Sequence, residues 1–286
     1  MSTTTSATVL RTGLATGWTE YRKSFSSRQD AVNYFGVSAA FLAVALLLQD
    51  SQAEGTVVPL GTVLLAGLIG FVFTMGGIVT VAQILSAERE DGTLLRARTL
   101  PRGLEAYVVA KAVHVLLVNL TNVAIILVPS FVLLERFGVH DPAGWWVLAL
   151  VFLLAVTSTV PVGAVLGAVV RNPRTTMNLV MIPVMGLALT SGILTPITTM
   201  PAWAQAVGQA FPIYWVGLGT RSVFLPDAAL GAEIGGSWRL LEMVGVLGVW
   251  SVVGLVVAPL VLRRTARRES GSSLAARRRA ARAASA

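Results

Sequence analysis

The sequence predicts an all-α integral membrane protein, and two observations support this fold class. Hydrophobic residues make up 55% of the 286 residues, and the mean hydropathy is +0.74. The apolar residues form runs long enough to cross ~30 Å of hydrocarbon, which takes about 20 helical residues, whereas soluble domains have shorter periodic pieces. Six transmembrane helices are expected, at about 31–49, 58–85, 105–134, 144–170, 175–195 and 240–262.

The distribution of positive charge predicts the orientation. With the N-terminus inside, the inner segments hold 18 of the 22 Lys and Arg residues and the outer segments hold three. Cytoplasmic loops carry such an excess, so both termini are expected in the cytoplasm. The last 24 positions hold eight basic residues, and a tail beside anionic lipid explains them more simply than nucleic-acid binding. The chain thus divides into an N-terminal segment (1–30), a membrane domain (31–262) and a basic cytoplasmic tail (263–286).

An amphipathic helix is expected before the first span. Residues 1–9 are rich in Ser and Thr and predict a disordered start, but apolar residues at helical spacing follow. They are Leu10, Leu14, Trp18, Tyr21 and Phe25. The helix is too polar to span a membrane, so we expect it in the interface plane with its aromatic rings at headgroup level. A soluble helix packed on another element is the alternative.

A charged stretch, residues 86–103, joins the second and third spans. Charges are expelled from hydrocarbon, so this stretch lies at a water-facing end of both spans. Asp91-Gly92 is a turn signal, and Thr93 can cap a second short helix. The apolar face of that helix would be formed by Leu94, Leu95 and Leu100, and the helix would be ended by Pro101 and Gly103. The pattern fits a helix that docks to another protein, and it fits an ordinary cytoplasmic loop equally well.

The segment between the fifth and sixth spans, residues 196–239, contains two short helical pieces. Pro201 suits the first turn of the first piece, and the second piece ends at Phe224. The first piece has an apolar stripe of Trp203, Ala206, Val207 and Ala210. Because neither piece is long enough to span, both are expected to be re-entrant or interfacial helices on the outer side. Their use is either a lid over an outer vestibule or packing on the lipid surface.

Two groups of motifs in these regions resemble one known family. The first group is Glu88-Arg89-Glu90-Asp91-Gly92-Thr93-Leu94, Thr99-Leu100-Pro101 and Ala110-Lys111. The second is Ser191-Gly192-Ile193-Leu194-Thr195-Pro196-Ile197, Met200-Pro201-Ala202-Trp203, Phe211-Pro212 and Arg221. Over nearly its whole length the chain resembles the membrane subunits of type-2 ABC transporters, the permeases of drug, polysaccharide and lipid exporters. Its composition is similar to the daunorubicin-resistance branch.

The resemblance implies roles for several residues. The N-terminal helix would be an elbow helix, and the charged stretch would be a cytoplasmic coupling helix seated in an ATPase subunit. Its ATPase-coupling residues would be Glu88, Arg89, Glu90, Asp91, Gly92 and Thr93. The extracellular re-entrant hairpin would use Thr195, Pro196, Pro201, Trp203, Phe211 and Pro212 as gate residues. The implied partners are two cytoplasmic ABC ATPase subunits, which hold the ATP and Mg, and a second permease copy or paralogue.

The chain itself carries little catalytic chemistry. Its only lysines, Lys23 and Lys111, do not follow a glycine, so the sequence holds no phosphate-binding loop, and neither catalysis nor a metal or cofactor is expected in this chain. His114 is either a proton relay or a polar residue that faces protein. Mild polar residues in the spans either line a path for cargo or form interhelical hydrogen bonds. The candidates for such a path are Gln83, Asn119, Asn122 and Asn178.

The resulting expectation is the permease of an ATP-driven exporter in a bacterial plasma membrane. Its cargo would be hydrophobic or amphiphilic, drug-like or antibiotic-like compounds moved outward, with membrane lipids as further partners. Export of a lipid or a lipid-linked glycan is one alternative, and a membrane scaffold or sensor that recruits a cytoplasmic protein is another. An ion-driven carrier is disfavoured because the spans hold almost no ionisable residues at mid-membrane.

Overall fold

The computed structural model describes residues 6–26, 28–52, 58–91, 93, 102–134, 137–170 and 173–267. Within these ranges the elements are helices, and no strand is formed. In chain order they are α1 (Ser6–Lys23), α2 (Arg28–Leu47), α3 (Leu60–Met75), the π-helix η1 (Gly76–Thr80), α4 (Val81–Asp91), α6 (Gly103–Leu133), α7 (Gly144–Val169), α8 (Pro173–Leu189), the 3₁₀ turn η2 (Ile197–Thr199), α9 (Ala202–Ala210), α10 (Pro212–Phe224), the 3₁₀ turns η3 (Asp227–Ala232) and η4 (Ile234–Gly236), and α11 (Leu240–Arg267).

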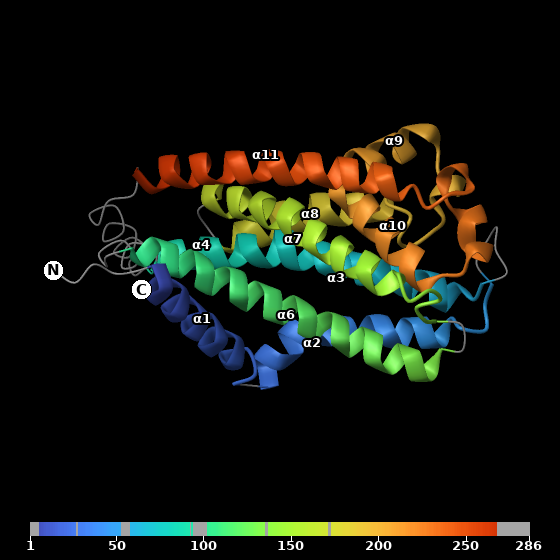
Figure 1. Cartoon of the computed structure of the whole chain (residues 1–286), viewed down its shortest axis with the longest axis horizontal. Helices are drawn as coiled ribbons and strands as arrows, with labels where there is room; N and C mark the ends of the chain where they lie inside the picture. The colour runs from blue at the N-terminus through green and yellow to red at the C-terminus, as the bar shows by residue number, and fades with distance from the viewer. Residues whose placement is uncertain are drawn as a thin grey trace, which may run out of the picture.

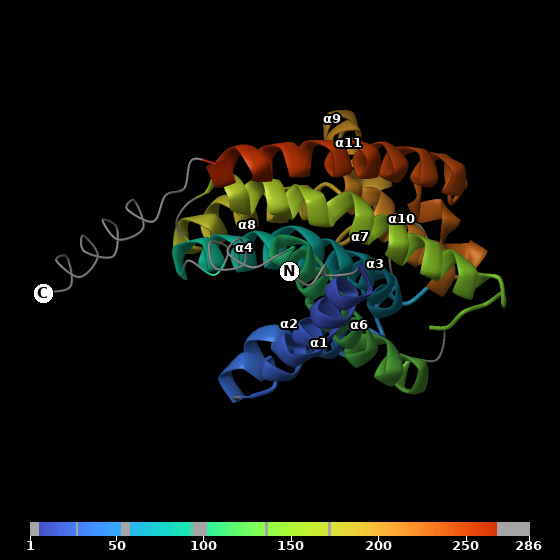
Figure 2. The same cartoon turned by 60° about the vertical axis from the view of Figure 1, so that its left-hand side comes forward.

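The helices form an elongated bundle with two distinct ends (Figure 1). At one end, called here the charged end, lie the start of α1, the end of α4 and the end of α11. At the opposite end, called the hairpin end, lie α9 and the 3₁₀ turns that follow α10. The turned view shows α11 on one side with α9 projecting beyond it, α3 and α4 in the middle, and α1, α2 and α6 on the other side (Figure 2).

Four helical segments are long and apolar enough to cross a membrane by length and composition. They are Leu60–Glu90, Glu105–Leu133, Gly144–Val169 and Leu240–Leu262, and each falls on a predicted span. The first and fifth predicted spans have only shorter apolar stretches, Ser38–Leu47 and Thr175–Leu189. The predicted end of the fifth span at residue 195 was wrong.

The fifth span ends early because the chain turns away after α8. The hydroxyls of Thr190 and Ser191 donate to the carbonyls of Leu187 and Ala188, which satisfies the last turn of the helix. Gly192 then takes φ of +72°, a conformation that glycine adopts without strain. The helix therefore stops at Leu189, and the apolar residues that follow belong to the hairpin end.

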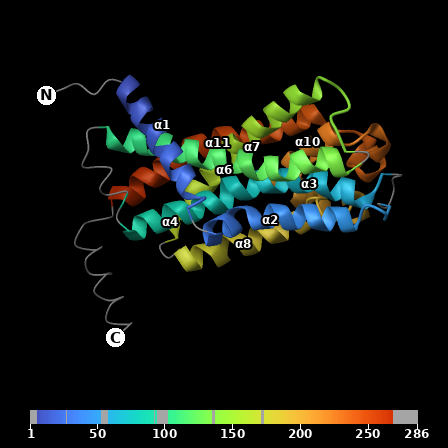
Figure 3. The ribbon, with the colours of Figure 1, turned by 90° about the horizontal axis from the view of Figure 1, so that it is seen from below.

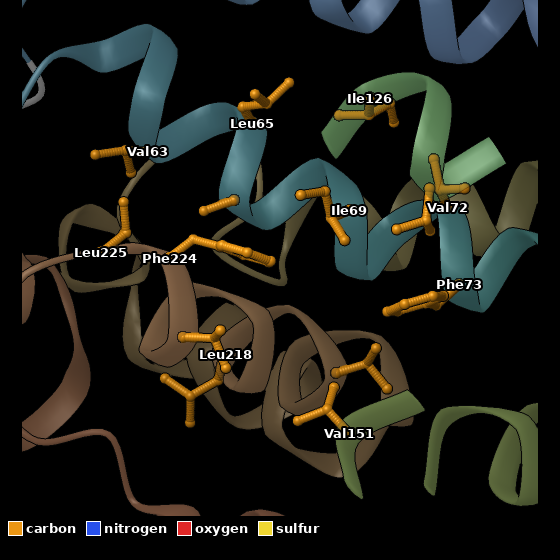
Figure 4. Packing of buried hydrophobic residues seen from close by; sticks show 14 of the residues in the cluster. Val63, Leu65, Ile69, Val72, Phe73, Ile126, Val151, Leu218, Phe224 and Leu225 are labelled. Carbon is orange, nitrogen blue, oxygen red and sulfur yellow. The ribbon is translucent and has the colours of Figure 1, made fainter. Parts of the chain in front are cut away.

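The long span formed by α3, η1 and α4 is the centre of the bundle. Its most apolar stretch is 89% buried, whereas those of the other three candidate spans are at most 33% buried. Side chains of α3 such as Ile69 and Phe73 pack against Leu218 and Phe224 of α10, with Ile126 and Val151 closing the cluster (Figure 4). This span therefore contacts α2, α6, α7, α8 and α10.

Glycines allow close packing around the π-helix in this span. A Cβ at Gly76 or Gly77 would collide with Asn119 of α6 or Thr159 of α7. A Cβ at Gly163 would collide with backbone carbonyls of Gly77 and Ile78. The Gly163-x-x-x-Gly167 pattern thus serves packing within the chain, as small residues do between membrane helices.

The two short amphipathic helices, α1 and α9, both pack through small residues. In α1 the buried positions are Val9, Gly13 and Gly17, against α6, which α1 crosses obliquely (Figure 3). In α9 they are Ala204 and Gly208. The predicted apolar stripes lie on the faces opposite to these contacts. About half of the surface of Leu10, Leu14 and Trp18 in α1 is exposed, and so are two-thirds of the surface of Trp203 in α9. Because α1 begins at Ser6, residues 6–9 are helical, contrary to the expectation for residues 1–9.

Candidate functional site

A cluster of charged side chains holds the charged end together. Lys111 of α6 donates to Glu20 of α1 at 2.7 Å and also forms an ion pair with Glu88 of α4. The hydroxyl of Tyr107, one turn before Lys111 on α6, donates to Glu88 as well. The three charged side chains are 16–27% exposed, so water reaches the edge of the cluster. One lysine therefore joins α1, α4 and α6.

His114 extends this cluster along α6. It is buried, its Nε2 lies 3.2 Å from Ser24 Oγ, and its Nδ1 lies 3.6 Å from Glu20 Oε2. Tyr21 adds a 2.7 Å hydrogen bond to Thr121. Of the two alternatives stated for His114, these contacts favour the polar residue that faces protein.

Arg89 lies on another face of α4 and is buried against α7. Its guanidinium donates to the carbonyl of Gly167 at 3.3 Å and to the carbonyl of Ala168. These carbonyls are at the C-terminal end of α7, where the helix leaves unpaired acceptors and a partial negative charge. Arg89 therefore caps α7 and fixes the rotation of α4.

The predicted coupling residues thus differ in what they contact. Glu88 and Arg89 bind other helices of this chain, whereas Glu90 and Thr93 are exposed at its end. The backbone of Asp91 ends α4. Gly92 and the predicted helix of residues 94–101 lie outside the described residues, so their place stays a prediction.

The predicted path residues are not brought to one surface. Asn122 accepts a 2.8 Å hydrogen bond from Ser38 of α2, an interhelical bond of the kind expected. Asn119 is buried against Gly76 of the π-helix, Gln83 contacts Met177 of α8, and Asn178 is exposed. Their role in a path stays a prediction.

The predicted gate residues surround α9. Pro201 is the N-cap of α9, one residue before the expected position, and Pro212 is the first residue of α10, which ends at Phe224 as predicted. Phe211 lies between the two helices, with its ring 5.9 Å from that of Trp250. The remaining gate candidates, Thr195, Pro196 and Trp203, are exposed or partly exposed.

A second group of charged residues lies under the hairpin end. Arg221 of α10 donates from Nε to Glu233 Oε1 at 2.5 Å, and both side chains are at most 4% exposed. Next to them, Arg239 donates to Tyr214 and Gln209 and stacks on Trp215 at 4.9 Å. Arg239 also pairs with Glu242 at 3.3 Å.

Sequence reasoning found only part of this arrangement. The three-residue spacing of Arg239 and Glu242 predicts their pairing, although Arg239 lies just before the start of α11. No local pattern connects Lys111 to Glu20 or Arg221 to Glu233. A burial signal was present for Arg221, which is the one charged residue in the otherwise mostly apolar α10. Its partner Glu233 lies beyond a proline and a glycine, where helical spacing gives no guide.

The long apolar helices and the all-helical bundle define a multi-pass membrane protein. The sequence model of the ABC-2 type transporter family matches residues 9–225, three-quarters of the chain. The chain belongs to this family. The match includes most of α1, the central span, α9 and α10, and it ends before η3, η4 and α11.

Two relatives share part of the chain. The probable multidrug ABC transporter permease YbhR of Escherichia coli strain K12 is 24% identical over 181 residues, and its counterpart in Escherichia coli O157:H7 has the same identity. The alignment covers 63% of this chain and 48% of each relative. The chain thus aligns with about half the length of these relatives.

Proposed function

We propose that this chain is the permease subunit of an ATP-driven exporter that moves hydrophobic or amphiphilic, drug-like compounds outward across the bacterial plasma membrane. Membership of the ABC-2 family supports a permease, and the multidrug name of the relatives supports this class of cargo. The observation that carries the proposal is the charged end of α4. It is fixed by Lys111 and Arg89 to neighbouring helices while Glu90 stays exposed.

The mechanism is a rigid-body push on α4. A separate ATPase dimer would bind the exposed part of the charged end and displace it on ATP binding. Because Arg89 caps α7 and Glu88 is tied through Lys111 to α1 and α6, these helices would move with α4. The displacement would pass along the central span to α10 and the hairpin end, and cargo would leave between two permease copies.

Glu90 is the residue to change when the docking is tested. Reversal of Glu88 or Arg89 would break contacts within the chain, whereas Glu90 is exposed and its reversal leaves the fold unchanged. The tagged full chain would be purified gently from its native membrane. We expect an ABC ATPase at a stoichiometric ratio, and recovery about tenfold lower for Glu90→Lys, because like charges at an interface oppose binding.

Asp50→Lys is the matched control, because Asp50 is an exposed acid after α2, at the end of the bundle opposite the charged end. It should leave ATPase recovery unchanged. Equal loss in both variants would contradict docking at the charged end, and a wild-type chain that comes out without an ATPase in repeated trials would refute the permease. The cargo class is tested on the reconstituted complex, where drug-like amphiphiles rather than phospholipids should stimulate ATP hydrolysis.

A further inference from the structure

The buried pair of Arg221 and Glu233 has polar atoms that the fold does not satisfy. Arg221 makes its one ion pair through Nε, and its Nη1 and Nη2 have no hydrogen-bond partner among the described residues. Oε2 of Glu233 is unpaired in the same way. A guanidinium usually binds a carboxylate through two parallel hydrogen bonds, so this pair uses half of its capacity.

Three glycines make room for the guanidinium. They are Gly67 of α3, Gly192 after α8 and Gly217 of α10. A Cβ at Gly67 or Gly217 would lie 3.4 or 3.2 Å from Nη1, and a Cβ at Gly192 would lie 3.6 Å from Nη2. Arg221 therefore fills a space between three segments, and its bond to Glu233 attaches a fourth, the chain after η3.

The pair has opposite effects on two states of this region. With the hairpin end closed, it ties the chain after η3 to α10, which packs on the central span. With the hairpin end lifted, water would reach Nη1, Nη2 and Oε2 and form the hydrogen bonds that the closed state lacks. Since unsatisfied buried charged groups lose their hydration without compensation, the closed state is held less firmly than its packing suggests.

We propose that the Arg221–Glu233 pair is a water-sensitive latch, which positions the hairpin end when dry and lowers the free energy of an opened, hydrated state. The latch deepens the proposed function, because opening at this end would let cargo leave. An ion pair that only stabilised the closed state would make a different prediction. Replacing both charges by apolar side chains of similar volume should close this end more firmly, because the uncompensated atoms disappear together.

Cysteine labelling can measure the opening, because the chain contains no cysteine. Ala229 of η3 is 1% exposed, so Ala229→Cys reacts with a water-soluble maleimide only when this region opens. Ala232, at 6% exposure, provides a second reporter. The full chain in lipid nanodiscs would be labelled with and without the double substitution R221M/E233L, and its thermal unfolding would be recorded in parallel.

The latch predicts labelling about tenfold slower in R221M/E233L and an equal or higher Tm, while R221M alone should label faster and unfold earlier. The control R102M/E105L removes an exposed pair at the charged end and should change neither readout. Faster or unchanged labelling in the double variant, at either reporter, would overturn the latch. Because no ATPase is present, this result is independent of whether an ATPase is recovered with the chain.

Discussion

The two ends of the bundle are each joined by one basic residue that bridges several segments, but the bridges differ in hydration. Lys111 binds two carboxylates, and its cluster is 16–27% exposed. Arg221 binds one carboxylate, and the pair is at most 4% exposed, with three polar atoms that find no partner in the described part of the chain. The first bridge is already in contact with water, whereas under the proposed latch the second gains hydrogen bonds when water enters. The charged end is therefore suited to transmit force, and the hairpin end to open.

The largest effect is expected when the buried bridge loses one partner. Arg221→Met leaves Glu233 charged and buried, which should lower the free energy of unfolding by about 3–5 kcal/mol. Thermal and chemical unfolding of the purified chain in mild detergent would measure it. The double variant R221M/E233L is the control and should recover the whole loss or exceed it. A single variant within about 1 kcal/mol of the unsubstituted chain would mean that the pair is hydrated in the closed state.

A smaller effect is expected between the two ends, at the π-helix of the central span. The Cβ of Gly77→Ala would collide with Thr159, so the variant should lose about 1–3 kcal/mol of stability through overpacking. Gly248→Ala in α11 is the matched control, because a Cβ there meets open space, and it should be neutral or slightly stabilising. Unfolding midpoints measure both. The close packing of η1 against α7 is refuted if Gly77→Ala leaves the unfolding midpoint unchanged and the double variant Gly77→Ala/Thr159→Ala is no more stable than Gly77→Ala.

The smallest effect is expected at the charged end. Lys111→Met leaves Glu20 and Glu88 without their common cation, but water already reaches them, so the cost should be about 1–2 kcal/mol. The same unfolding measurement applies, and Arg102→Met, in a more exposed pair, should leave the unfolding midpoint unchanged. A loss for Lys111→Met that equals the loss for Arg221→Met would remove the distinction between the two bridges.

Much of the fold could be predicted because hydropathy and length identify membrane helices without knowledge of their neighbours. The predicted spans 105–134 and 144–170 agree with α6 and α7 to within two residues at each end. The predicted end of the second short helix, Phe224, is the end of α10. The faces of α1 and α9 could not be predicted from their apolar stripes. Lipid is as apolar as a leucine side chain, so large apolar residues gain little from packing inward, and small residues mark the contact instead.

What the sequence by itself determined is the class of the protein and the order of its helices, because the hydrophobic effect and the backbone requirement for hydrogen bonds act locally along the chain. What only the tertiary structure decided is which charges meet. Lys111 meets residues 91 and 23 positions away, and Arg221 meets Glu233 across a turn in a space left by glycines from three segments. Such pairings depend on how helices cross, and no periodicity in the sequence encodes the crossing.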